Sequence, residues 1–87
     1  MPTQKFNTKS SWNAENQIVA TEELHLRINN PGFEKLYFEE TDNGVEPTVY
    51  PKDVSWVPPG DFLNLILKAG KTLHLAGGNG FASVLVG

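Results

Sequence analysis

The feature that most constrains this 87-residue chain is the alternation of apolar and polar residues near its C-terminal end. A strand points successive side chains to opposite faces, so apolar residues at every second position predict strands that bury one face. The leucines with this spacing are Leu63, Leu65, Leu67, Leu73 and Leu75. Gly70 supplies a turn between the two groups, and residues 77–80 supply another before a last strand at 81–86. These strands are expected to form much of the core.

The rest of the chain has the rhythm of a small β domain. Residues with strong turn preferences recur at intervals of about 10 to 18 residues, which is typical of a sandwich or barrel. Alternating segments at 22–29 and 35–40 are further candidate strands. We expect an all-β fold of six to eight short antiparallel strands, in a small sandwich or a partly closed barrel, with an extended N-terminal arm.

One hairpin is predicted at Asp42-Asn43-Gly44, because these residues tolerate positive φ. The second strand of that hairpin would lie at 45–50, where Pro47 and Pro51 restrict it to a sheet edge or an extended loop. Residues 51–61 are expected to form an irregular loop anchored by Trp56. Residues 1–11 are polar apart from Phe6 and are predicted to form the extended arm, with a single domain at 12–87.

Composition limits the classes of function. There are no cysteines, so neither a disulfide framework nor a thiol nucleophile is available. The net charge is −3 and the basic residues are scattered, which argues against nucleic acid as a partner. The sequence contains neither a signal-peptide pattern nor an apolar run of about 20 residues that would cross a membrane. We therefore expect a protein made in the cytoplasm, with no membrane association.

No residue constellation predicts catalysis. His25 and His74 are both expected to be half-exposed, outward-facing strand residues, and two ligands would make an incomplete metal site even on adjacent strands. The glycine-rich segment 77–80 is followed by a strand, whereas a phosphate cradle needs a helix N-terminus. We expect a non-enzymatic protein with no catalytic residues, no cofactor and no metal.

Two features indicate binding instead. Phe62 and Ile66 lie on the face opposite the leucines of their strand, so that strand is either central or covered by another chain. Trp12 and Trp56 either cap the ends of a thin core or form a carbohydrate-binding face. The candidate interface residues are Phe6, Trp12, Trp56, Phe62 and Ile66.

The C-terminal third resembles small virion proteins of tailed bacteriophages. The residues that carry the resemblance are Pro59-Gly60-Asp61, the run Leu65-Ile66-Leu67-Lys68-Ala69-Gly70-Lys71-Thr72-Leu73-His74-Leu75, and Ala82-Ser83-Val84-Leu85-Val86-Gly87. Such proteins decorate or stabilise capsids, or belong to the tail, and are usually homotrimers or other symmetric assemblies. The resemblance implies a virion protein that is a homo-oligomer, with a trimer favoured, bound to the major capsid protein or another virion protein.

On this hypothesis, the arm and the subunit contacts of Phe62 and Ile66 hold the protein on the particle, with Trp12 and Trp56 as further candidates. The alternatives are a small lectin-like module that binds glycans through the tryptophans, and an inhibitor of a host enzyme. Localisation to the virion follows only from the first hypothesis.

Overall fold

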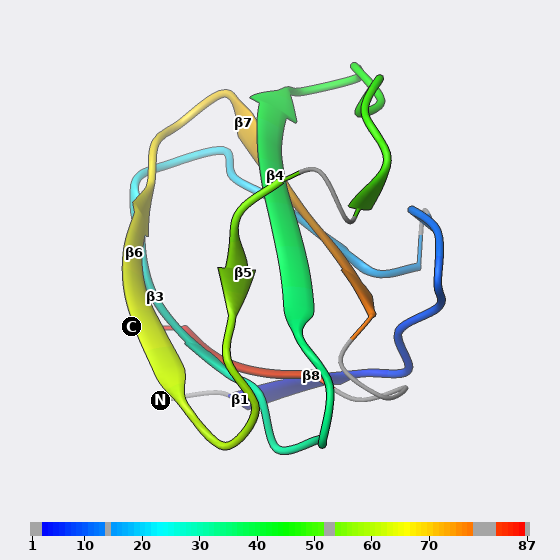
Figure 1. Ribbon diagram of the computed structural model, residues 1–87. Coiled ribbons are helices and arrows are strands. Elements are labelled where there is room, and N and C mark those ends of the chain that lie inside the picture. The colour runs from blue at the N-terminus through cyan, green and yellow to red at the C-terminus, as the bar shows by residue number, and fades with distance from the viewer. Residues whose placement is uncertain (1–2, 14, 52–53, 78–81, 87) are drawn as a thin grey trace.

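The computed structural model describes residues 3–13, 15–51, 54–77 and 82–86, which form two four-stranded antiparallel sheets (Figure 1). Sheet A contains, in spatial order, β1 (Thr3–Phe6), β8 (Ala82–Val86), β3 (Leu24–Asn29) and β6 (Phe62–Leu67). Sheet B contains, in spatial order, β2 (Gln17–Val19), β7 (Lys71–Gly77), β4 (Leu36–Asp42) and β5 (Trp56–Val57). The all-β prediction is confirmed, and the two sheets are compatible with a small sandwich.

The core lies between the sheets and follows the alternation of the sequence. In β3, Leu26 and Ile28 are buried while His25 and Arg27 are exposed. Across the sandwich, β7 and β4 contribute the buried side chains Leu73, Leu75 and Leu36. Burial of each such side chain contributes roughly 1.5–3 kcal/mol to folding. Among the described residues, no helix is long and apolar enough to cross a membrane.

The turn predicted at 42–44 is present, but the strand expected to follow it is not. Gly44 has a φ of 84°, and the amide of Val45 donates to the carbonyl of Asp42 at 3.0 Å. Residues 45–50, all described, then run as a loop, as the prolines allow. β4 pairs instead with β7 and, through Leu36 and Tyr37, with β5. Trp56 therefore lies in a short edge strand rather than in an irregular loop.

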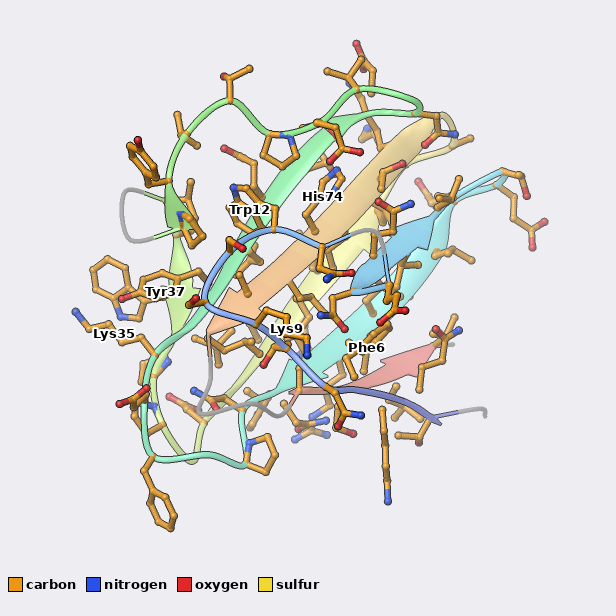
Figure 2. All side chains as sticks on the ribbon, turned by 90° about the vertical axis from the view of Figure 1, so that its right-hand side faces the viewer. Phe6, Lys9, Trp12, Lys35, Tyr37 and His74 are labelled. Carbon is orange, nitrogen blue, oxygen red and sulfur yellow. The ribbon has the colours of Figure 1, made fainter. Side chains whose placement is uncertain are left out.

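The N-terminal segment is extended, as expected, and residues 3–9 are held by the domain. β1 pairs with β8 from Thr3 opposite Leu85 to Phe6 opposite Ala82. The chain then crosses the outer face of sheet B, where the carbonyl of Lys9 accepts from the amide of Gly77 at 2.8 Å (Figure 2). The buried Thr8 hydroxyl donates to the carbonyl of Gly77. This segment therefore links the edge of sheet A to the outer face of sheet B.

The passage of the N-terminal segment across the outer face of sheet B has a consequence for the burial of β7. Its residues from Thr72 to Ala76 are buried on both faces, although the sequence predicts one exposed face. His74 does point away from the core, but it is only 2% exposed because Trp12 packs over it. The expected half-exposure of His74 is therefore wrong, since alternation within a strand does not reveal what covers the outer face.

Candidate interaction surface

The outer face of sheet A brings together side chains from β3 and β6. The two strands pair in a continuous register in which His25 lies opposite Ile66, Arg27 opposite Asn64, and Asn29 opposite Phe62. Directly opposed residues of antiparallel strands share a face. The sheet therefore presents a strip in which apolar and polar side chains alternate along β6.

The apolar part of the strip is well exposed. Phe62 is 46% exposed and Ile66 is 50% exposed, and both lie on the same face of β6. The guanidinium carbon of Arg27 lies 3.8 Å from the centroid of the Phe62 ring, a cation–π contact that fixes both side chains. Leu85 of β8 lies opposite Arg27 and extends the surface towards the middle of the sheet. We call the set His25, Arg27, Phe62, Asn64, Ile66 and Leu85 the sheet A strip.

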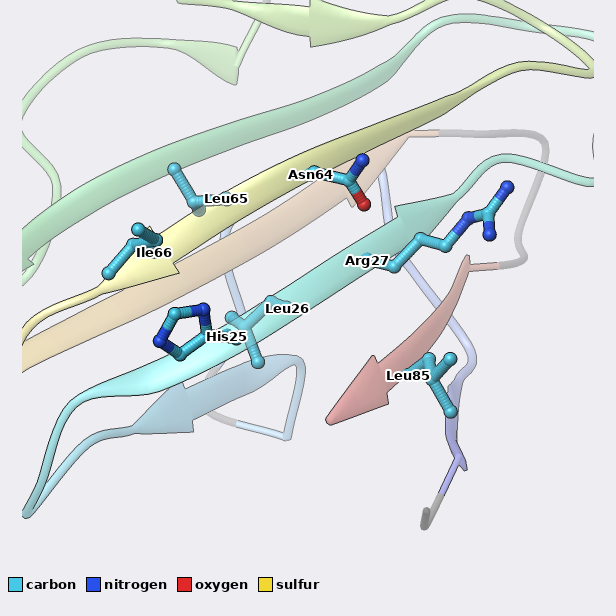
Figure 3. A pocket seen from close by; sticks show the side chains of 7 residues that line it. All are labelled: His25, Leu26, Arg27, Asn64, Leu65, Ile66 and Leu85. Atoms are coloured by element: carbon cyan, nitrogen blue, oxygen red, sulfur yellow. The ribbon is translucent and has the colours of Figure 1, made fainter. Parts of the chain in front are cut away.

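The centre of the sheet A strip is hollowed. A shallow, open depression of ≈ 490 Å³ lies between β3, β6 and β8 (Figure 3). His25, Arg27, Asn64, Ile66 and Leu85 all line it, together with Leu26 and Leu65. Its lining is mostly apolar and includes one permanent cation, Arg27. A surface of this shape suits a protein side chain better than a small molecule, which needs a deeper enclosure.

β6 is also the edge strand of sheet A. β6 carries apolar residues on both faces, which the sequence explained either by a central position in the sheet or by cover from another chain. The edge position excludes the first explanation. Leu63 and Leu65 face the core but remain partly exposed, whereas Leu67 at the end of the strand is fully buried. The core is thus only partly closed along the free edge of β6.

Trp56 lies on a different surface. It is 47% exposed and pairs across the strands with Tyr37, while the ammonium of Lys35 lies 4.2 Å from the centroid of its ring. A hollow of ≈ 600 Å³ nearby is lined in part by Phe33, Lys35 and Tyr37. Aromatic rings, a cation and a hollow therefore gather at the β5 edge of sheet B.

Phe6 and Trp12 make their contacts within the chain itself. Phe6 is partly buried and packs against the core from β1. The indole Nε1 of Trp12 donates to the carbonyl of Val49 at 2.7 Å, and the ring meets His74 edge-on at a centroid distance of 6.3 Å. The structure thus brings Phe62 and Ile66 together and places Trp56, Phe6 and Trp12 elsewhere.

The hydrogen bonds around His74 require a proton on its Nε2 atom. The hydroxyl of Thr41 donates its one proton to the carbonyl of Val45 at 2.7 Å, since a carbonyl oxygen can only accept. His74 Nε2, 2.8 Å from the same hydroxyl oxygen, must therefore carry a proton and donate it. Burial lowers the pKa of His74, and the nearby carboxylates of Glu46 and Glu39 oppose this effect without reversing it.

The two histidines do not form a metal site. His25 lies on sheet A, exposed and 3.5 Å from a carboxylate oxygen of Glu23, whereas His74 lies on sheet B. No group of three or more His, Cys, Asp or Glu side chains is arranged to hold a metal within the described ranges. The glycine-rich segment 78–80, also considered above, lies outside the described residues.

One exposed ion pair lies at the far end of sheet B. The ammonium of Lys71 donates to the carboxylate of Asp42, opposite it in the β4–β7 register. The hydrogen bond and the charge of that carboxylate raise the pKa of Lys71. This pair lies beside the turn at 42–44 and takes no part in the sheet A strip.

The chain matches no family model, no curated protein and no solved structure. Its function must therefore be inferred from the surfaces themselves. The sequence pattern identified Phe62 and Ile66, but it did not identify Arg27, Asn64 and Leu85 as their neighbours. The signal for Arg27 was present, because alternation in 22–29 places it outward, but the β3–β6 pairing that brings it to Phe62 is not encoded locally.

Proposed function

We propose that this protein is a non-enzymatic binding domain that attaches to another protein through the sheet A strip. The observation that carries the proposal is the exposure of Phe62 and Ile66 on one face of an ordered edge strand. Contiguous apolar surface rimmed by polar groups is typical of protein interaction sites. Arg27, stacked on Phe62, adds a side chain that is enriched at such interfaces.

The binding role that best fits the chain is that of a bacteriophage virion component which decorates or stabilises the capsid. The C-terminal resemblance supports this role, and the strip includes residues of that segment, namely Ile66 and Leu85. The protein would add apolar contacts across subunit boundaries of the shell. Stable attachment would require an interface of about 1,200–2,000 Å² in total, more than the strip alone would bury.

The described N-terminal residues favour attachment through the strip rather than through the arm. β1 already pairs with β8 along one side, Lys9 accepts from Gly77, and Phe6 packs against the core, so this segment is held by the domain. A partner that took up this segment would first have to break those contacts. The strip is available without any rearrangement.

Co-sedimentation with capsid shells would test this proposal. Purified protein is mixed with shells assembled from the major capsid protein encoded with it, and the pellet is compared with that of a Phe62→Ser, Ile66→Ser double variant. We expect the wild type to pellet with the shells and the variant to remain in the supernatant. A Val49→Ser variant, whose side chain is exposed away from the strip, is the control and should pellet normally. Wild-type protein that stays in solution at all ratios would refute the capsid role.

Trp56 favours a second candidate, a carbohydrate-binding module. An exposed indole beside Tyr37 and a hollow could stack against a sugar ring, provided that Lys35 moves off its face. Titration of tryptophan fluorescence with a glycan panel tests this alternative. A Trp12→Phe variant isolates the Trp56 signal, and saturable quenching in that variant would favour glycan binding, whereas an unchanged signal would argue against it.

A further inference from the structure

We propose that the β6 edge of the sheet A strip binds a second copy of this chain, with the two β6 strands pairing antiparallel about a two-fold axis at Asn64. This pairing would join the two copies of sheet A into one eight-stranded sheet. The inference rests on the proposed function, because it names a partner for the same surface. Four features of β6 support it.

The first feature is the unprotected edge. An edge strand exposes unpaired N–H and C=O groups, and natural proteins usually block such edges with charges, prolines, bulges or short strands. The other three edges follow this rule: β2 has three residues, β5 has two, and β1 has four and carries Lys5. β6 has six residues, FLNLIL, with neither charge nor proline, and it pairs with β3 without a bulge. Among the edges that the described residues form, this one is the best suited to accept another strand.

The second feature is the symmetry of the outward residues about Asn64. Directly opposed residues of an antiparallel pair share a face, so a two-fold axis must pass through a residue rather than between residues. An axis at Asn64 places Phe62 opposite Ile66 of the second copy, and Ile66 opposite Phe62 of the second copy. Aromatic and β-branched residues form favourable cross-strand pairs, and the two Asn64 amides meet at the axis. An axis at Leu65 would instead oppose Asn64 to Ile66, and Phe62 to Lys68.

The third feature is the incomplete core behind β6. Leu63 and Leu65 face inward but are partly exposed at the free edge. The axis at Asn64 opposes Leu63 to Leu65 of the second copy on that inner face. Both faces of β6 would then carry matching apolar cross-strand pairs, which fits its two-sided apolar character.

The fourth feature is the charge at the ends of the strand. Asp61 immediately precedes β6 and Lys68 immediately follows it, and both are exposed. Antiparallel pairing brings the Asp61 end of one copy to the Lys68 end of the other. The opposite charges therefore lie one position apart at both ends of the paired strands, whereas a parallel arrangement would bring like charges together.

The second and third features favour a second copy over an unrelated strand, because the apolar residues on both faces of β6 are self-complementary about Asn64. Pairing of a single six-residue strand buries an area at the low end of specific interfaces. The dimer is therefore expected to be weak and to dissociate on dilution. A two-fold axis gives dimers, whereas the resemblance implies trimers, so the solution mass distinguishes the two.

The first experiment is covalent trapping at the axis. The chain has no cysteine, so Asn64→Cys introduces a single thiol whose counterpart in the second copy lies directly opposite. Directly opposed residues of antiparallel strands have Cα atoms about 4.5–5.5 Å apart, within the range of about 4.4–6.8 Å that a disulfide spans. We expect mild oxidation to convert this variant to a disulfide-linked dimer. Leu85→Cys, on the same face but on β8, is the control and should remain largely monomeric under the same conditions.

The second experiment is light scattering across a dilution series, with charge placed on the strip. We expect the wild type to be a dimer at high concentration, and Ile66→Lys to raise the dissociation constant about tenfold or more, because both Phe62–Ile66 pairs are lost. Leu85→Lys should leave the constant nearly unchanged. Lys68→Glu should weaken the dimer, and adding Asp61→Lys to it should restore the affinity.

The outcomes separate the alternatives. A wild-type monomer at every concentration, a trimer, or a dimer that tolerates Ile66→Lys would each overturn the pairing of β6. A dimer weakened as much by Leu85→Lys as by Ile66→Lys would indicate face-to-face stacking of the sheets, which also overturns it. Co-sedimentation with capsid shells is measured separately. A failed prediction of the dimer would therefore leave the binding function standing, and failed co-sedimentation would leave the dimer standing.

Discussion

Replacing Gly77 by alanine should destabilise the protein well beyond the usual penalty for alanine at a positive-φ glycine. Gly77 has a φ of 80°, and a Cβ atom there would lie 2.8 Å from the backbone carbonyl oxygen of Lys35 and 2.8 Å from Cδ2 of Tyr37. The left-handed conformation alone costs an L-residue about 1–2 kcal/mol. Relieving the clash requires β4 and β7 to separate, because the carbonyl belongs to the backbone, and overpacking of this kind costs about 1–3 kcal/mol more.

Gly70 provides a matched control. Its φ is 84°, and a Cβ atom would have nothing within 4 Å, so Gly70→Ala incurs only the conformational cost. We expect Gly70→Ala to lower the free energy of unfolding by about 1–2 kcal/mol and Gly77→Ala by about 2–5 kcal/mol. For a domain of this size each kcal/mol lowers Tm by about 4–8 °C. Urea unfolding followed by tryptophan fluorescence measures the difference, and equal values for the two variants would refute the close approach at Gly77.

Three further predictions concern stability. The first concerns His74, whose pKa is about 6.5 in the unfolded chain and is lowered by burial in the folded protein. Near and below pH 6.5 the unfolded chain therefore binds more protons than the folded protein, so the free energy of unfolding should fall as the pH drops from about 7 towards about 5.5. His74→Gln should flatten this dependence in urea titrations. Leu75→Ala should lower the free energy of unfolding by about 2–5 kcal/mol, whereas Ile66→Ala in dilute solution should change it by less than about 0.5 kcal/mol, as measured by chemical denaturation. Deleting residues 2–6 removes β1 and uncovers one edge of β8, so calorimetry should show a lower Tm and hydrogen exchange should show faster exchange of β8 amides; an unchanged Tm would show that β1 adds nothing to the fold.

The buried and exposed residues of a strand were predictable wherever the alternation of its side chains alone determines them. Alternation in 22–29 and 62–67 placed Leu26, Ile28 and Leu67 in the core and Arg27 and Phe62 outside it, and all five are found there. Alternation is a local property, so it remains informative without any knowledge of the neighbouring strands.

Strand partners and the covering of outer faces were not predictable. The turn at 42–44 suggested pairing with the next segment, but β4 pairs with β7, about 30 residues further on. The burial of His74 depends on Trp12, which lies 62 residues earlier in the chain, and the anchor of that indole is the carbonyl of Val49. Such contacts arise from the topology, which a single sequence read locally does not contain. The sheet A strip was therefore only half predicted, through Phe62 and Ile66 but without their neighbours on β3 and β8.

The pairing of β1 with β8 has a consequence for how the protein is made. Thr3 lies opposite Leu85, which follows it in the chain by 82 residues, so β1 must wait until β8 has been synthesised before sheet A is complete. β8 also separates β1 from β3, and until it arrives the inner edge of β3 stays open. Closure of such long loops slows folding, and unpaired strands favour aggregation in the meantime. Sheet A is therefore expected to be completed only after β8 has been synthesised, and arrested nascent chains that end before residue 82 should remain sensitive to protease.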